Sequence, residues 1–236
     1  MKVLVTGGAG YVGSHLVQRL RQAGHTIRVL DVAPVSRRVL TDPGCELIQG
    51  SIADLNLVTQ AMQGSEAVCH LAWGFHPSDD RQEIHANLFG TLNLLEAALK
   101  ARVQHFLFAS TAVVYGPTEA GPVDEEYPCY PERSAIGGPV YGITKLACEK
   151  LCLVYQRRGL PVTVFRMHGV FGDHHLSQFA HMIEQVMAGE PVKAIREAGG
   201  EYVHPEDVLR GFLLAIGNEK ADGQVFNVAG SYTYRD

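Results

Sequence analysis

The stretch Val3-Leu4-Val5-Thr6-Gly7-Gly8-Ala9-Gly10-Tyr11-Val12-Gly13 decides how this chain folds. An apolar run ends in clustered glycines, and Leu16, Val17 and Leu20 then follow at helical spacing. The pattern predicts a strand, a tight turn and a helix. Glycines allow positive φ angles and a close approach of the backbone to a phosphate. A helix N-terminus adds N–H groups and the positive end of a dipole. The stretch therefore predicts a phosphate-binding loop.

The glycines fit two patterns of dinucleotide-binding loops. Gly8, Gly10 and Gly13 read GxGxxG, whereas Gly7, Gly10 and Gly13 read GxxGxxG. A second apolar run ends at Asp31, close to the spacing of roughly 20 residues at which such sites carry an acidic residue. Strand, helix, strand and acid together predict a dinucleotide site.

Asp31 also favours NAD over NADP. A carboxylate at the tip of the second strand accepts hydrogen bonds from the adenosine ribose and repels a 2′-phosphate. Arg37 and Arg38 follow and would instead favour NADP. We interpret them as solvated loop charges, because Asp31 occupies the discriminating position.

Length and composition set broad limits on the protein. The chain has 236 residues, of which 46% are hydrophobic, and a formal net charge of −5. Such a charge argues against nucleic-acid binding and against a basic membrane-binding patch. No apolar run is long enough to span a membrane, and the N-terminus does not resemble a signal peptide. We therefore expect a cytoplasmic protein without nucleic-acid or membrane partners.

The cysteines and histidines give no sign of a metal site. None of the five cysteines forms a CxxC pair, so reduced thiols are expected; they are Cys45, Cys69, Cys129, Cys148 and Cys152. His174 and His175 lie beside Asp173. Adjacent histidines seldom converge on one ion without a third ligand at a suitable spacing. We predict no bound metal.

Strands and helices alternate along the rest of the chain. Short apolar runs predict strands at 46–49, 67–72, 105–109, 162–165 and 224–228. Helices are predicted between them, and one of these holds Ile84, Leu88, Leu92, Leu95 and Leu99 at a spacing of about one turn. This alternation predicts an α/β fold with a doubly wound parallel sheet of Rossmann type and helices on both faces.

Tyr141-Gly142-Ile143-Thr144-Lys145 carries the predicted chemistry. The phenol and the ammonium lie at i and i+4 on one helix face. Unit charges ~6 Å apart at an effective dielectric near 20 interact by roughly 3 kcal/mol, which is about two pK units. We therefore expect Lys145 to lower the pKa of Tyr141 to about 8. The phenol would then take a proton from a substrate hydroxyl, with Thr111 bonded to the same oxygen.

At this point the chain resembles the extended branch of the short-chain dehydrogenase/reductase family, the NAD-dependent sugar epimerases and dehydratases such as UDP-galactose 4-epimerase. The resemblance runs from Val3 to Asn227. Besides the glycine loop and Tyr141 to Lys145, the motifs that carry it are His70-Leu71-Ala72, Asn87-Leu88-Phe89-Gly90-Thr91, Ser110 to Gly116, and Tyr202-Val203-His204 before Asp207.

The resemblance implies a set of functional residues. The catalytic residues would be Thr111, Tyr141 and Lys145, with Lys145 also holding the nicotinamide ribose. The expected NAD-binding residues are Gly7, Gly10, Tyr11, Val12, Gly13, Asp31, Ser51, Ile52, Leu71, Ala72, Trp73, Asn87, Tyr141, Lys145, Met167 and His168. The expected substrate-binding residues are His76, Thr111, Tyr141, Gly169 and Arg196. The family also implies a homodimer built on the helices that contain Asn87 and Tyr141.

Three positions depart from the family pattern. Ser51 stands where an Asp usually contacts adenine, and its hydroxyl can still accept a hydrogen bond from the exocyclic amine. Gly169 and Gly200 stand where sugar-nucleotide members often have an Asn and an Arg that bind the diphosphate. Arg196 is a candidate replacement for that Arg.

The residues after Thr111 separate the reactions of the family. Dehydratases and decarboxylases carry acidic residues there, whereas this chain has Ala112-Val113. We therefore expect an NAD-dependent epimerase that acts on a sugar derivative, in particular a nucleotide sugar. The alternatives are a dehydrogenase or reductase of a non-nucleotide alcohol or ketone and, from another class, a non-catalytic NAD-binding regulatory module.

The expected organisation is an NAD-binding core and a smaller substrate region. Residues 1–168 form the core with the Tyr141 helix, and 169–236 supply substrate-side segments interleaved with its last strands. Family members usually continue for several tens of residues beyond the strand at 224–228. We therefore expect an incomplete C-terminal substrate region and a shallow cleft lined by His76, Thr111, Tyr141 and His168.

Overall fold

A computed structural model describes residues 1–33, 45–76, 78–118, 122–134, 136–138, 140–172, 178–191, 201–230 and 232–233. Their central feature is a seven-stranded sheet in the order β3-β2-β1-β4-β5-β6-β9, with every neighbouring pair parallel. Its strands are β1 (Lys2–Thr6), β2 (Thr26–Asp31), β3 (Cys45–Gln49), β4 (Ala67–His70), β5 (His105–Thr111), β6 (Val162–Met167) and β9 (Val225–Val228). The predicted Rossmann-type sheet is confirmed.

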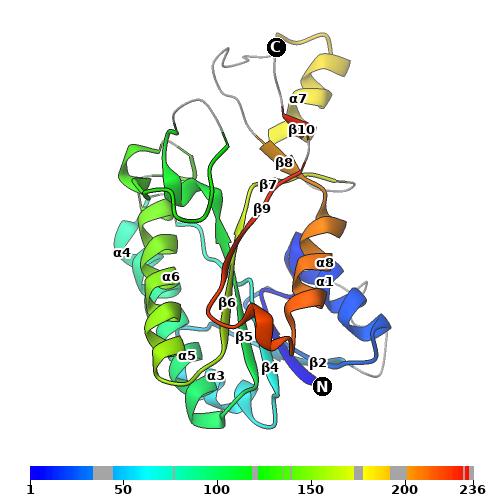
Figure 1. Ribbon diagram of the computed structural model, residues 1–236. Coiled ribbons are helices and arrows are strands. Elements are labelled where there is room, and N and C mark those ends of the chain that lie inside the picture. The colour runs from blue at the N-terminus through cyan, green and yellow to red at the C-terminus, as the bar shows by residue number, and fades with distance from the viewer. Residues whose placement is uncertain are drawn as a thin grey trace.

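Helices cover both faces of the sheet (Figure 1). One face carries α1 (Tyr11–Gln22) and α8 (Pro205–Ala215), whose side chains pack in one cluster with those of β1, β2 and β5. The other carries α3 (Leu55–Met62), α5 (Gly90–Ala101) and α6 (Tyr141–Arg157). On this second face, α3 begins where Asp54 caps it by accepting hydrogen bonds from the N–H groups of Asn56 and Leu57.

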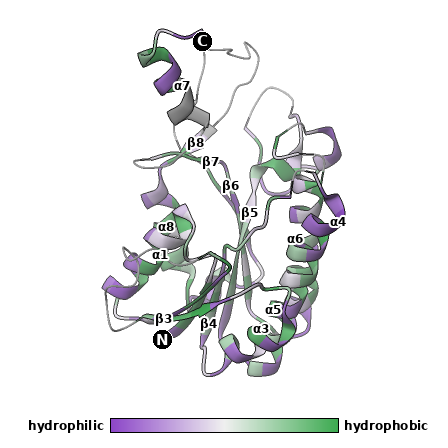
Figure 2. Ribbon diagram, turned by 180° about the vertical axis from the view of Figure 1, so that it is seen from behind, coloured by the Kyte–Doolittle hydropathy of each residue, from purple (hydrophilic) through white to green (hydrophobic). Residues whose placement is uncertain are grey.

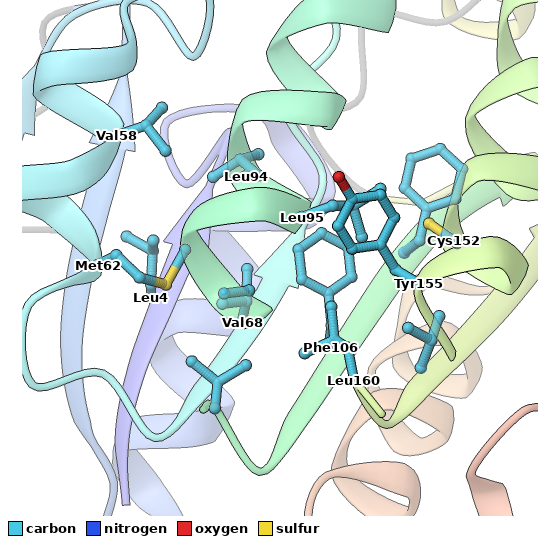
Figure 3. Packing of buried hydrophobic residues seen from close by; sticks show 14 of the residues in the cluster. Leu4, Val58, Met62, Val68, Leu94, Leu95, Phe106, Cys152, Tyr155 and Leu160 are labelled. Carbon is cyan, nitrogen blue, oxygen red and sulfur yellow. The ribbon is translucent and has the colours of Figure 1, made fainter. Parts of the chain in front are cut away.

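The alternation of side chains along β1 explains both hydrophobic clusters. Val3 and Val5 are buried with the α1 face, whereas Leu4 between them is buried with the α3 and α5 face. Figure 3 shows the second cluster, in which Phe106 of β5 lies among side chains of α5 and α6. Figure 2 shows the hydrophobic residues of these helices turned toward the sheet.

The predicted helix that holds Ile84 and Leu99 is present, but it contains a π-helical turn that the apolar spacing did not predict. The chain forms α4 (Asp80–Ile84), a π-helical turn η1 (His85–Phe89) and then α5. Apolar spacing of about one turn does not distinguish a π turn from continuous α-helix. The π turn includes Asn87, which is 1% exposed.

A second, smaller sheet lies beyond the carboxyl ends of the large one. It joins β7 (Gly169–Val170), β8 (Glu201–Val203) and β10 (Tyr232–Thr233) in the order β10-β8-β7. Figure 1 shows it near α7 (Gln178–Met187), past the end of β6. The short helical turns η2 (Ala112–Tyr115), η3 (Pro131–Arg133) and η4 (Glu219–Ala221) complete the described elements.

None of the helices in the described part of the chain is both long and apolar enough to cross a bilayer.

Candidate active site

The predicted site residues gather at the carboxyl edge of the large sheet. The chain reverses its direction of strand addition at β1, which lies between β2 and β4. Open α/β sheets bind their ligands in the crevice at such a switch point. The glycine loop follows β1, and Leu71-Ala72 follows β4. The two segments touch, since the N–H of Ala72 donates to Oγ1 of Thr6.

The glycine loop has no room for side chains. Gly7 has φ +74°, and a Cβ added there would lie 2.5 Å from the backbone nitrogen of Ala72. A Cβ at Gly13 would lie 2.1 Å from the carbonyl oxygen of Gly7. Gly10 precedes α1 and makes no side-chain cap to it, so the backbone alone forms this end of the helix. This backbone cradle at a helix N-terminus fits the pyrophosphate of a dinucleotide.

Asp31 lies beside this loop at the end of β2. Its Oδ2 accepts from the N–H of Ala9 at 2.8 Å, and its Oδ1 accepts from the N–H of Ala33 at 2.9 Å. Each carboxylate oxygen has a second lone pair, so ribose hydroxyls can bond to the same group. Arg37 and Arg38 lie outside the described residues.

The other predicted cofactor positions line the same edge. Ser51 accepts from the N–H of Ala53 through its hydroxyl at 3.1 Å. Ile52 packs so closely on Gly90 that a Cβ there would lie 2.5 Å from its Cγ1. On the opposite side of the crevice, Met167 ends β6 in register with Thr111 and Val228. The N–H of His168 donates to the carbonyl of Val228.

Tyr141 and Thr111 are brought together as predicted. Thr111 is the last residue of β5, and Tyr141 is the first of α6. Burial raises the pKa of the Tyr141 phenol above its ordinary value, a hydrogen bond with Thr111 partly offsets this rise, and the charge of Glu83 adds to it.

The prediction that Lys145 lowers the pKa of Tyr141 is wrong for this structure. The Lys145 ammonium is buried and donates to the carbonyl of Ala109 at 2.7 Å. It also lies 3.8 Å from the centre of the Trp73 ring. Desolvation lowers the pKa of Lys145 to about 7. The i, i+4 spacing predicts that Tyr141 and Lys145 lie on one helix face. It does not predict the direction or the burial of the long lysine side chain.

The segment Trp73–His76 lies against Tyr141. The Trp73 ring meets Tyr141 edge-on, with centres 5.7 Å apart, and Phe75 stacks on it at 5.4 Å. Asn87 holds this segment, because its side chain accepts from the N–H of Gly74 at 2.8 Å and donates to its carbonyl at 2.7 Å. The amide of Asn87 is therefore engaged with the protein backbone.

Sequence reasoning missed Glu83. This residue of α4 is 3% exposed and accepts from the N–H of His76 through Oε2. The signal that would have pointed to it is its place one helical turn before Asn87. An acid at that spacing falls on the same buried helix face.

The predicted substrate residues are only partly described. His76 is half-buried at the end of the segment that lies against Tyr141, and Gly169 is exposed in β7. Arg196, Gly200 and the residues Asp173 to His175 lie outside the described part. Within that part, no group of three His, Cys, Asp or Glu side chains is arranged to hold a metal ion.

Comparison with known proteins identifies the relatives of this chain. Residues 3–229 match the model of the NAD dependent epimerase/dehydratase family. A 3 beta-hydroxysteroid dehydrogenase/Delta 5-->4-isomerase of Mycobacterium tuberculosis is 33% identical over 94% of this chain, which spans 62% of that relative's length.

Solved structures of other proteins share the fold of this chain. The UDP-glucose 4-epimerase of Thermotoga maritima, determined with UDP-glucose, superposes with a TM-score of 0.86 at 29% identity over 99% of this chain and 78% of its own. The UDP-glucuronic acid 4-epimerase of Bacillus cereus, in complex with UDP-glucuronic acid and NAD, gives 0.85 at 27% identity over 99% and 79%.

Proposed function

Because the chain belongs to the NAD dependent epimerase/dehydratase family, we propose that this enzyme is an epimerase of a nucleotide sugar. It oxidises a secondary hydroxyl to a ketone and then returns the hydride to the opposite face of the same carbon. The observation that carries the proposal is the placement of Thr111 and Tyr141 together at the carboxyl edge of the sheet, the edge at which the glycine loop also lies.

In this proposal, different residues of the chain bind the dinucleotide and transfer the proton. The glycine loop and Asp31 would hold the dinucleotide, which supplies a hydride acceptor and a positive charge when bound. Tyr141 takes the proton of the substrate hydroxyl as it is oxidised and gives it back on reduction. Thr111 holds the same substrate oxygen, and Lys145 binds the ribose after turning away from Ala109.

The turn after Thr111 favours epimerisation over elimination. Dehydratases and decarboxylases of the family carry acidic residues directly after the threonine, and η2 provides only Ala112, Val113 and Val114 there before Tyr115. Solved relatives with UDP-glucose and with UDP-glucuronic acid support a sugar nucleotide as the substrate class.

The test is incubation of the NAD-loaded protein with UDP-glucose, followed by chromatographic separation of UDP-glucose from UDP-galactose. We expect the 4-epimer to form without accumulation of reduced nicotinamide. Tyr141→Phe is the control and should abolish turnover while NAD affinity stays nearly unchanged. Stoichiometric reduction of added NAD without epimer would contradict the proposal.

One observation favours a second candidate, a dehydrogenase of an apolar alcohol. Phe75 stacks on Tyr141 and yet is 60% exposed, so an aromatic surface adjoins the reacting phenol. The relative from M. tuberculosis is named as a hydroxysteroid dehydrogenase. Reduction of added NAD in the presence of a 3β-hydroxysteroid, and not with UDP-glucose, would select this candidate.

A further inference from the structure

Glu83 is a buried acid with incomplete hydrogen bonding. Its side chain is 3% exposed, and Oε2 accepts from the N–H of His76 at 3.2 Å. Oε1 is buried without a hydrogen-bond partner among the described residues. Burying a carboxylate with so few partners lowers stability. Such a residue at the edge of an active site points to a functional reason for the acid.

Glu83 and Asn87 hold one short segment at two points. Four residues apart, they project from the same side of the α4–η1 helix. Asn87 binds both backbone groups of Gly74, and Glu83 binds the N–H of His76. Phe75 lies between these two tethers and stacks on Tyr141 with an interplanar angle of 28°. The position of this aromatic ring on the catalytic phenol therefore depends on both side chains.

Glu83 also acts on Tyr141 through its charge. The groups that face the phenol are Thr111 from β5, the rings of Trp73 and Phe75, and Glu83 from α4. Lys145, on the same helix as Tyr141, donates to Ala109 instead. After burial, Glu83 is the remaining cause that raises the pKa of the phenol. The acid thus opposes the loss of the proton.

We propose that Glu83 is a positioning residue of this active site, which holds the segment Trp73–His76 against Tyr141. The proposal rests on the acid–base role of Tyr141 in the proposed function. The tether and the effect of the acid on the pKa of Tyr141 are measured separately.

Two substitutions separate the tether from the charge. Glu83→Gln keeps an acceptor oxygen for the N–H of His76 but removes the charge, whereas Glu83→Ala removes both. Asp80→Asn is the matched control, because Asp80 is an exposed acid on the same helix. Circular dichroism verifies that each variant is folded.

The tether is measured by fluorescence, because Trp73 is the only tryptophan of the chain. Acrylamide quenching of its emission reports how firmly the segment lies on Tyr141. We expect Glu83→Gln and Asp80→Asn to match the parent protein and Glu83→Ala to be quenched about twice as strongly. Unchanged quenching in Glu83→Ala would overturn the tether. Should Glu83→Ala not fold, Asn87→Ser removes one of the two hydrogen bonds to Gly74 and should give the same increase.

The charge is measured by tyrosinate absorbance in the NAD-loaded protein, after subtraction of the same variant that also carries Tyr141→Phe. We expect the ionisation midpoint of Tyr141 to fall by about half a unit or more in Glu83→Gln, a threefold rise in its acid constant. Asp80→Asn should leave the midpoint in place. An unshifted midpoint in Glu83→Gln would overturn the charge effect. Neither measurement needs a sugar substrate, so a failure of epimerisation is distinguishable from a failure of this proposal.

Discussion

The burial of Lys145 makes the stability of the folded protein depend on pH. The pKa of Lys145 falls to about 7 through desolvation, well below that of a lysine in the unfolded chain. Between these two values the unfolded state binds more protons, so this residue makes stability rise with pH. Below about pH 7 the ammonium is charged in both states, and the full penalty of burying it is present.

We expect Lys145→Met to stabilise the protein at pH 6 to 7, since methionine keeps the apolar contacts with Trp73 without a charge. The gain should shrink as the pH rises above about 7. Urea unfolding of both proteins between about pH 6 and 8.5 measures this difference and cancels the titration of other groups. NAD affinity should fall in the same variant. A gain in stability that is independent of pH would show that the burial of charge is not its cause.

The Asp31 carboxylate should decide between NAD and NADP. Asp31→Ala removes the acceptor for the Ala9 N–H, the ribose contact and the repulsion of a 2′-phosphate. We expect NAD affinity to fall roughly tenfold and the preference over NADP to narrow. Calorimetric titration with each dinucleotide measures both. Asp31→Asn keeps an oxygen for Ala9, so it should lose the discrimination with a smaller loss of NAD affinity. NADP binding more tightly than NAD to the parent protein would contradict the assignment.

At the scale of elements, local periodicity predicted the large sheet but not the small second sheet or the π turn. Alternating apolar runs are sufficient to identify buried parallel strands such as β1 and β5. The strands β7, β8 and β10 have two or three residues each, too few to show a period. The hydrogen bonds of Asn87 in the π turn to Gly74 are tertiary contacts and leave no periodic signal. The direction of the Lys145 side chain was unpredictable for the same reason, because it is set by tertiary contacts with Ala109 and Trp73.

Two glycines in helices, Gly13 of α1 and Gly211 of α8, test how tight the turn between β1 and α1 is. Gly13→Ala places a methyl group 2.1 Å from the carbonyl oxygen of Gly7, so the turn must shift. We expect lower stability and strongly weakened NAD binding. Gly211→Ala in α8 is the matched control, because its Cβ would meet Phe165 at an ordinary 3.5 Å. That variant should gain up to about 1 kcal/mol of stability from helix propensity. Thermal unfolding and NAD titration of both variants measure these effects. Equal stability and equal NAD affinity in the two variants would contradict a tight turn at Gly13.

At the scale of the whole molecule, one buried ion pair connects distant parts of the chain. Arg166 of β6 and Glu149 of α6 lie 2.9 Å apart and are both almost fully buried. Glu149 also accepts from the hydroxyl of Ser110 in β5. Arg166 donates to the hydroxyl of Tyr115 and to the carbonyl of Glu125. The pair thereby joins two strands and a helix to the loop that follows the catalytic edge.

We expect Glu149→Gln to destabilise the protein by about 3–5 kcal/mol, since it leaves the Arg166 charge buried without a carboxylate. The exposed pair between Arg19 and Glu206, 2.7 Å apart, is the natural comparison. Glu206→Gln should cost less than about 1 kcal/mol, because solvent screens this pair. Urea unfolding of both variants gives the two free energies. If burial and the connection to the loop determine how much an ion pair stabilises this protein, the two variants lose severalfold different free energies of unfolding. This holds although the N···O distances of the two pairs are similar. Equal losses would mean that solvent reaches Arg166 and that the pair does not hold the loop to the sheet.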